Sequence, residues 1–177
     1  MKKKIFGKAV LVLCLMSLVG IAFVIIQDMM RTSTDYLDLA REQIKEKNYR
    51  MGVVSLLRAS KGGLQEADYE LALLYDVGDK IPENREKAIH HMKLAADKGW
   101  APAQYALAVW MERGYFGQVN VTDVVRLYEQ AATQGHQNAM KSLIVLYGGM
   151  DGISANPGRQ AYWIKQLKQE TEKGWEK

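Results

Sequence analysis

The sequence predicts an all-α protein: a right-handed α-solenoid of antiparallel helix pairs, preceded by one N-terminal transmembrane helix. Two observations carry this prediction. Small and apolar residues recur every 36 positions through the middle of the chain. An uncharged, largely apolar run of 19 residues lies close to the amino terminus.

The 36-residue period recurs at four positions of each copy. Alanine, glycine, alanine and leucine return in the same order, at Ala59, Gly63, Ala67 and Leu71, then Ala95, Gly99, Ala103 and Leu107, then Ala131, Gly135, Ala139 and Leu143. A fixed period of this length is typical of one supersecondary unit that is stacked on copies of itself until a continuous core forms. We therefore expect an extended repeat domain with a surface suited to binding.

The amino end predicts a membrane anchor. Residues 1–8 are basic, with four lysines, and residues 9–27 are the candidate transmembrane segment. At about 1.5 Å per residue this helix would span about 28 Å, close to the hydrocarbon thickness of a bilayer. The positive-inside rule then places the amino end in the cytoplasm. The expected location is a bacterial inner membrane, crossed once, with the repeat domain in the periplasm.

A cleaved secretory signal peptide is the alternative for the same segment. Against it, the apolar core is longer than that of an ordinary signal peptide, and no pair of small residues marks a cleavage site after it. A protein secreted after cleavage is therefore the second possibility.

After a short linker, residues 28–33, the repeat domain is expected over residues 34–177 as about four helix pairs. Thr34 is the expected cap of the first helix, and Asn48 gives a turn into a second helix over residues 49–60.

The clearest copy predicts both of its helices. Ala67 and Leu71 begin an apolar stripe at helical spacing, and this helix ends near Asp76. Its partner helix is expected over residues 85–98. Gly99, the next residue, can adopt the left-handed conformation that ends a helix.

The next copies follow the same plan. A helix from Pro102 ends at Gly114, and Thr122 with Asp123 is the expected cap of its partner. The third copy begins near Asn138 and drifts, as terminal repeats do, and the last helix is expected over residues 159–173.

Charge argues against a nucleic-acid partner, and cysteine content excludes an intramolecular disulfide. The chain has 24 Lys and Arg against 20 Asp and Glu, but removing the four lysines of residues 1–8 and Asp28 leaves 20 against 19. A nearly neutral repeat region has no electrostatic footprint for nucleic acid. Cys14 is the only cysteine, so no intramolecular disulfide is possible.

No constellation for catalysis stands out. Glu86 and His90 lie at i, i+4, but a metal site needs three or four ligands and no second cluster accompanies them. We expect no metal, no cofactor, no small-molecule substrate and no enzymatic activity. An enzyme that acts on cell wall or lipid is the alternative from another class, and its candidate carboxylates are Glu66, Asp68, Glu70 and Glu112.

The periodic residues resemble in their spacing the Sel-1-like repeat family, a branch of the tetratricopeptide superfamily. The family pattern is similar to the following positions of the best copy: Ala67, Leu71, Tyr75, Gly78, Lys87, Ala88, Ala95, Ala96, Gly99 and Ala103. Alanine at Ala72 and Ala108 departs from the glycine that the family favours. The resemblance implies a helix-pair solenoid and a binding role, in which members serve as adaptors, signalling scaffolds, secreted modulators or toxin-neutralising proteins.

A partner would meet the face of the first helices that the core leaves free. That face carries two tyrosines one repeat apart, and aromatic residues are enriched at binding hot spots. The candidate partner-binding residues are Tyr69, Leu73, Asp76, Tyr105, Val109, Glu112 and Lys141. The other possibility is that these tyrosines pack between neighbouring helices.

The predicted function is therefore a membrane-anchored, non-enzymatic scaffold that binds a protein or peptide. Immunity is the alternative within the binding class, in which the solenoid neutralises a toxin outside the cytoplasm.

Overall fold

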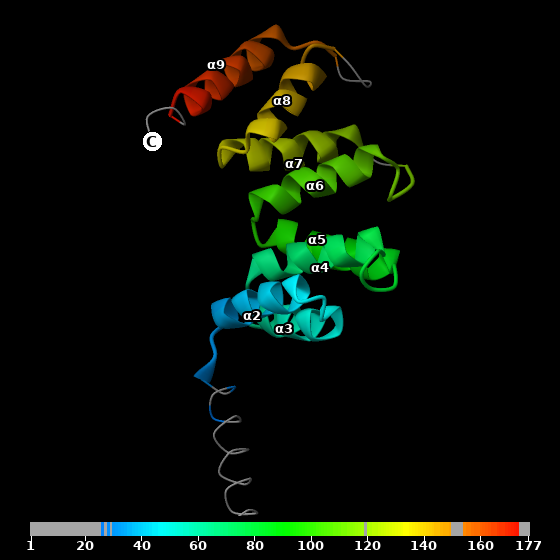
Figure 1. The fold of residues 1–177 in the computed structure, drawn as a ribbon. Coiled ribbons are helices and arrows are strands. Elements are labelled where there is room, and N and C mark those ends of the chain that lie inside the picture. Colours follow the sequence, from blue (N-terminus) through cyan, green and yellow to red (C-terminus); the bar gives the residue numbers. More distant parts are fainter. Residues whose placement is uncertain (1–25, 27, 29, 119, 150–153, 174–177) are drawn as a thin grey trace, which may run out of the picture.

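The computed structural model describes residues 26, 28, 30–118, 120–149 and 154–173, and within them it contains eight α-helices and no strand (Figure 1). In chain order the helices are α2 (Ser33–Lys45), α3 (Tyr49–Lys61), α4 (Gln65–Val77), α5 (Arg85–Asp97), α6 (Ala101–Glu112), α7 (Val121–Thr133), α8 (Gln137–Leu146) and α9 (Pro157–Lys173). The predicted all-helical repeat fold is confirmed.

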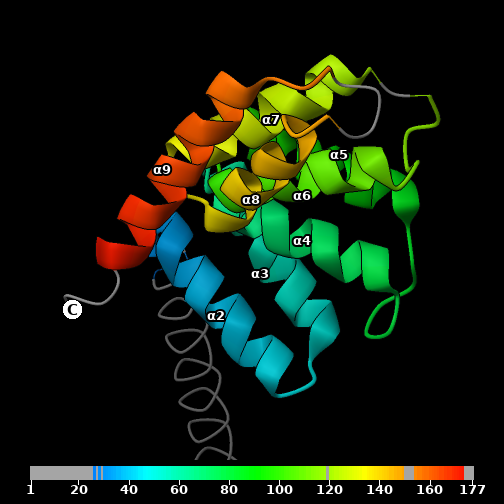
Figure 2. The ribbon, with the colours of Figure 1, turned by 90° about the horizontal axis from the view of Figure 1, so that it is seen from above.

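The helices pack as successive pairs, α2 with α3, α4 with α5, α6 with α7 and α8 with α9, and each pair contacts the next. Figure 1 shows the pairs stacked from α2 and α3 at one end to α9 at the other. Seen from above, the pairs are rotated relative to one another (Figure 2). The result is an extended stack, in which each helix pair is covered by its neighbours along the chain.

The 36-residue period corresponds to a repeated helix ending. Gly63, Gly99 and Gly135 have φ values of 93°, 87° and 88°, in the left-handed region that favours glycine. The residue after each glycine donates its N–H to an alanine carbonyl, from Leu64 to Ala59 at 3.2 Å, Trp100 to Ala95 at 3.1 Å and His136 to Ala131 at 3.2 Å. The periodic alanine and glycine therefore define one turn, used after α3, α5 and α7.

The core divides within α4. Ala67, Leu71 and Leu74 join the buried cluster of the first pair, together with residues such as Leu56 of α3. Ala72, on another side of α4, joins a larger cluster that continues through α8 to Trp163 of α9. Helix α4 thus contributes to both cores.

Two predicted helix caps are wrong by two positions. Thr32, not Thr34, caps α2, because its hydroxyl accepts from the N–H of Asp35 while the Asp35 carboxylate accepts from the N–H of Thr32. Asn120, not Thr122, caps α7 by accepting from a backbone N–H two residues later. In both cases several capping residues lie close together, and spacing alone does not choose among them.

The predicted basic terminus (residues 1–8) lies outside the described residues, as does the membrane segment (residues 9–27) except for Ile26. Within the part of the chain that the structure describes, no helix is both long enough and apolar enough to cross a bilayer. In the predicted linker, Asp28 is bound to the repeat domain, because Arg58 of α3 donates to both of its carboxylate oxygens at 2.8 Å.

Candidate partner-binding surface

The two tyrosines of the predicted binding face lie partly inside the stack. Tyr69 and Tyr105 are half-buried and pack against the larger core, as does Val109. The Tyr105 ring stacks on His136 with 4.6 Å between ring centroids. Burial raises the pKa of Tyr69, in agreement with a ring partly removed from water. Much of this surface therefore contacts neighbouring helices.

His136 has two structural roles that the sequence did not indicate. Its Nδ1 accepts from the N–H of Ala139 at 3.3 Å and so caps α8, while its ring lies against Tyr105. Burial lowers the pKa of His136, which favours the neutral imidazole that this cap requires.

Two other predicted residues, Glu112 and Lys141, lie at one hollow. Glu112 ends α6 and Lys141 lies on α8, and both line a depression of about 340 Å³ together with Val145 and Leu146. The structure thus brings together residues that are 29 positions apart, because α7 packs against both α6 and α8.

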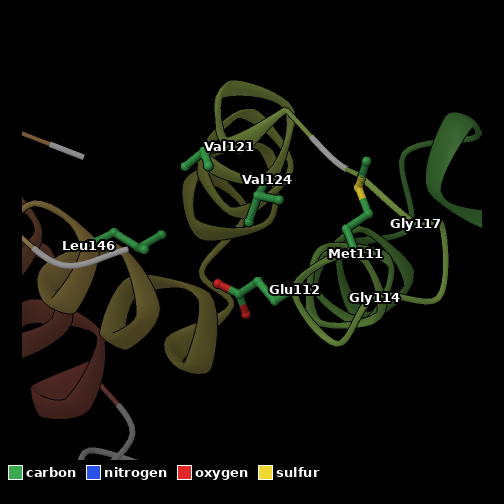
Figure 3. A pocket seen from close by; sticks show the side chains of 7 residues that line it. All are labelled: Met111, Glu112, Gly114, Gly117, Val121, Val124 and Leu146. Atoms are coloured by element: carbon green, nitrogen blue, oxygen red, sulfur yellow. The ribbon is translucent and has the colours of Figure 1, made fainter. Parts of the chain in front are cut away.

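An adjoining hollow of about 490 Å³ shares Glu112 and Leu146 with the first. Its other side chains come from the end of α6 and the start of α7, and Figure 3 shows Glu112 extending from α6 toward Val124 and Leu146. We call the two hollows together the turn-end hollow; its principal lining residues are Met111, Glu112, Val121, Val124, Lys141, Val145 and Leu146.

The carboxylate of Glu112 is held in place by the buried side chain of Tyr128. The hydroxyl of Tyr128, a residue 1% exposed, donates to Glu112 Oε2 at 2.5 Å. Burial, followed by this hydrogen bond, raises the pKa of Tyr128 far above its ordinary value, so the hydroxyl remains a donor. A fixed negative group among apolar side chains, with a lysine nearby, can orient a bound segment that offers both apolar and charged groups.

Leu73 lies elsewhere. It is 36% exposed and lines a separate depression of about 240 Å³ with Ile44, Glu70 and Val77, near the junction of the first two pairs. Asp76, near the end of the same helix, is half-buried. The candidate residues are therefore distributed over at least two depressions of the described surface.

The carboxylates considered for catalysis each have a structural partner. Glu66 and Glu70 both accept from Arg41 of α2, with N to O distances of 2.6 Å and 2.7 Å. Glu112 accepts from Tyr128 as described above. These contacts join neighbouring helices, so the three carboxylates have structural roles in the stack.

Asp68 is the most unusual of these groups, because it is charged and fully buried. It accepts from Ser60 Oγ at 2.6 Å and Lys98 Nζ at 2.7 Å, and it lies 2.9 Å from His91 Nδ1. Burial by itself would raise the pKa of Asp68, but the hydrogen bonds from His91, Lys98 and Ser60 outweigh it and lower the pKa to about 2. Sequence reasoning missed this cluster, although a charged residue directly after Ala67 of the core stripe was its signal.

Comparison with known families finds the Sel1 repeat twice, over residues 65–100 and 101–136. Each match is one period long, and together they cover α4 to α7 with the turns that follow them.

Curated relatives share part of their length with this chain. DAP3-binding cell death enhancer 1 of mouse is 33% identical over 99 residues, which are 55% of this chain and 19% of the mouse protein. Chitin synthase regulatory factor 2 of Schizosaccharomyces pombe is 28% identical over 104 residues, 58% of this chain and 20% of the yeast protein. The matched regions span about a fifth of these relatives.

Solved structures share the architecture. A Sel1 repeat protein from Oxalobacter formigenes matches with a TM-score of 0.67 and 25% identity, over 77% of this chain and 57% of that one. Immunity protein Pa5087 from Pseudomonas aeruginosa matches with a TM-score of 0.51 and 20% identity, over 76% of this chain and 58% of that one. The second likeness concerns the fold alone.

The localisation expected from the sequence is corrected by these relatives. Mouse and fission yeast proteins among the curated matches contradict a bacterial inner-membrane protein with its repeats in the periplasm. The physical reason is that an apolar run with flanking lysines carries information about insertion and orientation, whereas it does not identify a cell type or a compartment.

Proposed function

Because this chain belongs to the Sel1-like repeat family, whose members serve as protein-interaction scaffolds, we propose that it is a non-enzymatic scaffold that binds a protein or peptide through the turn-end hollow. The observation that carries the proposal is the hollow itself. Its walls come from α6, α7 and α8, so it exists only when consecutive repeats are stacked.

The chemistry of the hollow supports an amphipathic partner segment. Val121 and Val145 are 37% and 49% exposed, so a bound segment would remove apolar surface from water. Glu112 and Lys141 offer opposite charges within it. Complementary charges favour register and specificity more than they add affinity.

The hydrogen-bonding of the carboxylates supports a binding role over a catalytic one. A general acid or base needs a group poised to exchange a proton near neutral pH. The pKa of Asp68 lies at about 2, and Glu66 and Glu70 are ion-paired with Arg41.

Quantitative capture of partners from native cells tests this proposal. The double substitution Val121→Asp, Val145→Asp places charge on the apolar walls, and we expect it to abolish recovery of a partner that the wild type retains. Ile164→Asp is the matched control, because Ile164 is 51% exposed on α9 and does not line the hollow. Unchanged recovery by the double variant, with intact helical circular dichroism, would exclude the hollow.

The tyrosine face remains a separate prediction. The same capture with Tyr69→Ala, Tyr105→Ala tests it, provided that thermal unfolding shows the variant to be folded, because both rings also contribute to packing.

Toxin neutralisation is the special case in which the bound partner is a toxin. It remains a prediction, and loss of protection in cells that lack the protein, restored by the wild type but not by Val121→Asp, Val145→Asp, would support it.

A further inference from the structure

The outward face of α3 combines exposed apolar and basic side chains. Met51, Val54 and Leu57 are 45%, 39% and 42% exposed. At 3.6 residues per turn they lie on the same side of the helix as Arg50, Arg58 and Lys61, which are also exposed. The opposite side is buried against α2 and α4, through residues such as Leu56 and Ala59. We call these six residues the α3 face.

The repeats themselves provide an internal comparison for this face. One period later, the positions of Met51, Val54 and Leu57 are occupied on α5 by Lys87, His90 and Lys93, and two periods later on α7 by Asp123, Arg126 and Glu129. The helices occupy equivalent places in their pairs, so exposure at these positions calls for polar residues. The apolar row of α3 departs from the chain's own pattern, and packing within the described stack does not account for it.

Charge on α3 has one sign. The helix contains Arg50, Arg58 and Lys61 and no Asp or Glu. Arg58 is engaged by Asp28 at 2.8 Å and lies over the Tyr36 ring at 5.3 Å from its centroid. Arg50 and Lys61 therefore remain as exposed cations near the two ends of the apolar row.

We propose that the α3 face docks an acidic amphipathic helix of a partner protein. The row from Met51 to Leu57 is about 9 Å long and one helix wide, which matches apolar residues at i, i+3 or i+4, and i+7 of a second helix. Asp or Glu beside those residues would meet Arg50 and Lys61. A membrane surface is disfavoured, because the row contains no Trp or Phe and the helix cannot embed its buried side.

This surface is distinct from the turn-end hollow. It lies on α3 at one end of the stack, whereas the hollow lies between α6, α7 and α8 (Figure 1). A partner could therefore be held at two places, and the two sites can be tested independently.

The test measures binding of a short synthetic helical peptide of leucine and glutamate to the full-length chain by fluorescence anisotropy, with a leucine and lysine peptide of the same pattern for comparison. Wild type should bind the acidic peptide at least tenfold more tightly than the basic one, and added salt should weaken the binding.

The triple variant Met51→Lys, Val54→His, Leu57→Lys copies the residues of α5, so its fold is expected to tolerate them. It should bind the acidic peptide at least tenfold more weakly than wild type.

Whether the triple variant binds the acidic peptide more weakly or more tightly than wild type distinguishes apolar docking from attraction by charge alone. The triple variant carries more positive charge, so attraction by charge alone would strengthen binding and overturn the proposal. Arg50→Gln, Lys61→Gln should also weaken binding, while Lys87→Gln, Lys93→Gln on α5 should leave it unchanged. Absence of peptide binding, or binding by the α3 face only to vesicles of phosphatidylglycerol and phosphatidylcholine, would overturn the proposal as well.

Discussion

At the scale of single residues, Asp68 combines a large cost of desolvation with the hydrogen bonds that offset it. A buried carboxylate without partners would be neutral or would destabilise the fold, because the loss of hydration costs several kcal/mol. Hydrogen bonds from Ser60 and Lys98, with His91 at 2.9 Å, offset that cost and keep the group ionised. The carboxylate consequently ties α3, α4 and α5 together at a single point.

This arrangement predicts a loss of stability in acid. The pKa of Asp68 is lowered from 3.8 to about 2, so the folded protein binds this proton less tightly than the unfolded chain. The stabilisation is fully present above about pH 4 and is lost as the pH falls toward 2, with a magnitude of about 2 kcal/mol. Urea unfolding of wild type and Asp68→Asn across this range measures it, and the variant should lack this part of the pH dependence.

Glu66→Gln is the control for that measurement. Glu66 is in an exposed ion pair with Arg41, and such pairs contribute about 1 kcal/mol or less. Equal pH dependence in wild type and Asp68→Asn would contradict the assignment of the acid-sensitive term to Asp68.

At the scale of the elements, the repeat conserves a contact while changing its chemistry. Asp68 and Lys98 join the first and second helices of one copy at 2.7 Å. One period later, Gln104 and Gln134 occupy the same two positions and are joined at 2.8 Å. Gln104 also donates to the carbonyl of Ala96, which occupies the position of Ser60 in the preceding copy. The same link between helices is therefore ionic in one copy and neutral in the next.

Double-mutant cycles should distinguish the two links. We expect a coupling energy of about 1.5 to 3 kcal/mol between Asp68 and Lys98, because hydrogen bonds to charged groups are the stronger class. Gln104 and Gln134 should couple by about 0.5 to 1.5 kcal/mol. Alanine substitutions and urea unfolding at neutral pH provide both values. Equal coupling energies would show that desolvation of the ionic pair cancels its electrostatic advantage.

The elements also show what sequence could and could not predict. The helices from α4 to α7 follow from the period, since Gly63, Gly99 and Gly135 do adopt the left-handed conformation that ends a helix. The caps at Thr32 and Asn120 were missed, because neighbouring Thr and Asp residues can serve equally well in a local pattern. The role of Asp68 was missed because its partners lie on two other helices, Ser60 on α3 and His91 and Lys98 on α5 and its cap.

At the scale of the whole molecule, the candidate binding surface depends on how the pairs are stacked. Glu112 and Lys141 were selected from the sequence, and both line the turn-end hollow. Val121 and Val124 of the same hollow were not selected, because they lie on α7, a second helix of its pair, and only the first helices were considered as the binding face. A one-dimensional period predicts which residues share a helix face, but it does not give the rotation between successive pairs that forms a depression.

The division of the core predicts how the stack opens. Leu56 and Leu143 are both fully buried, the first in the cluster of α2 to α4 and the second in the cluster that runs to α9. Either leucine to alanine substitution should cost about 2 to 5 kcal/mol. In repeat proteins each unit contacts only its neighbours, so a local loss should raise local opening first.

Hydrogen exchange resolved along the chain is the measurement for this prediction. Leu56→Ala should accelerate amide exchange in α2 and α3 while α6 to α8 keep their protection, and Leu143→Ala should produce the opposite pattern. Helix α4 belongs to both clusters, so its exchange should rise in both variants. A uniform rise over all described helices in either variant would contradict the division, because it would mean that the two clusters open as one cooperative unit.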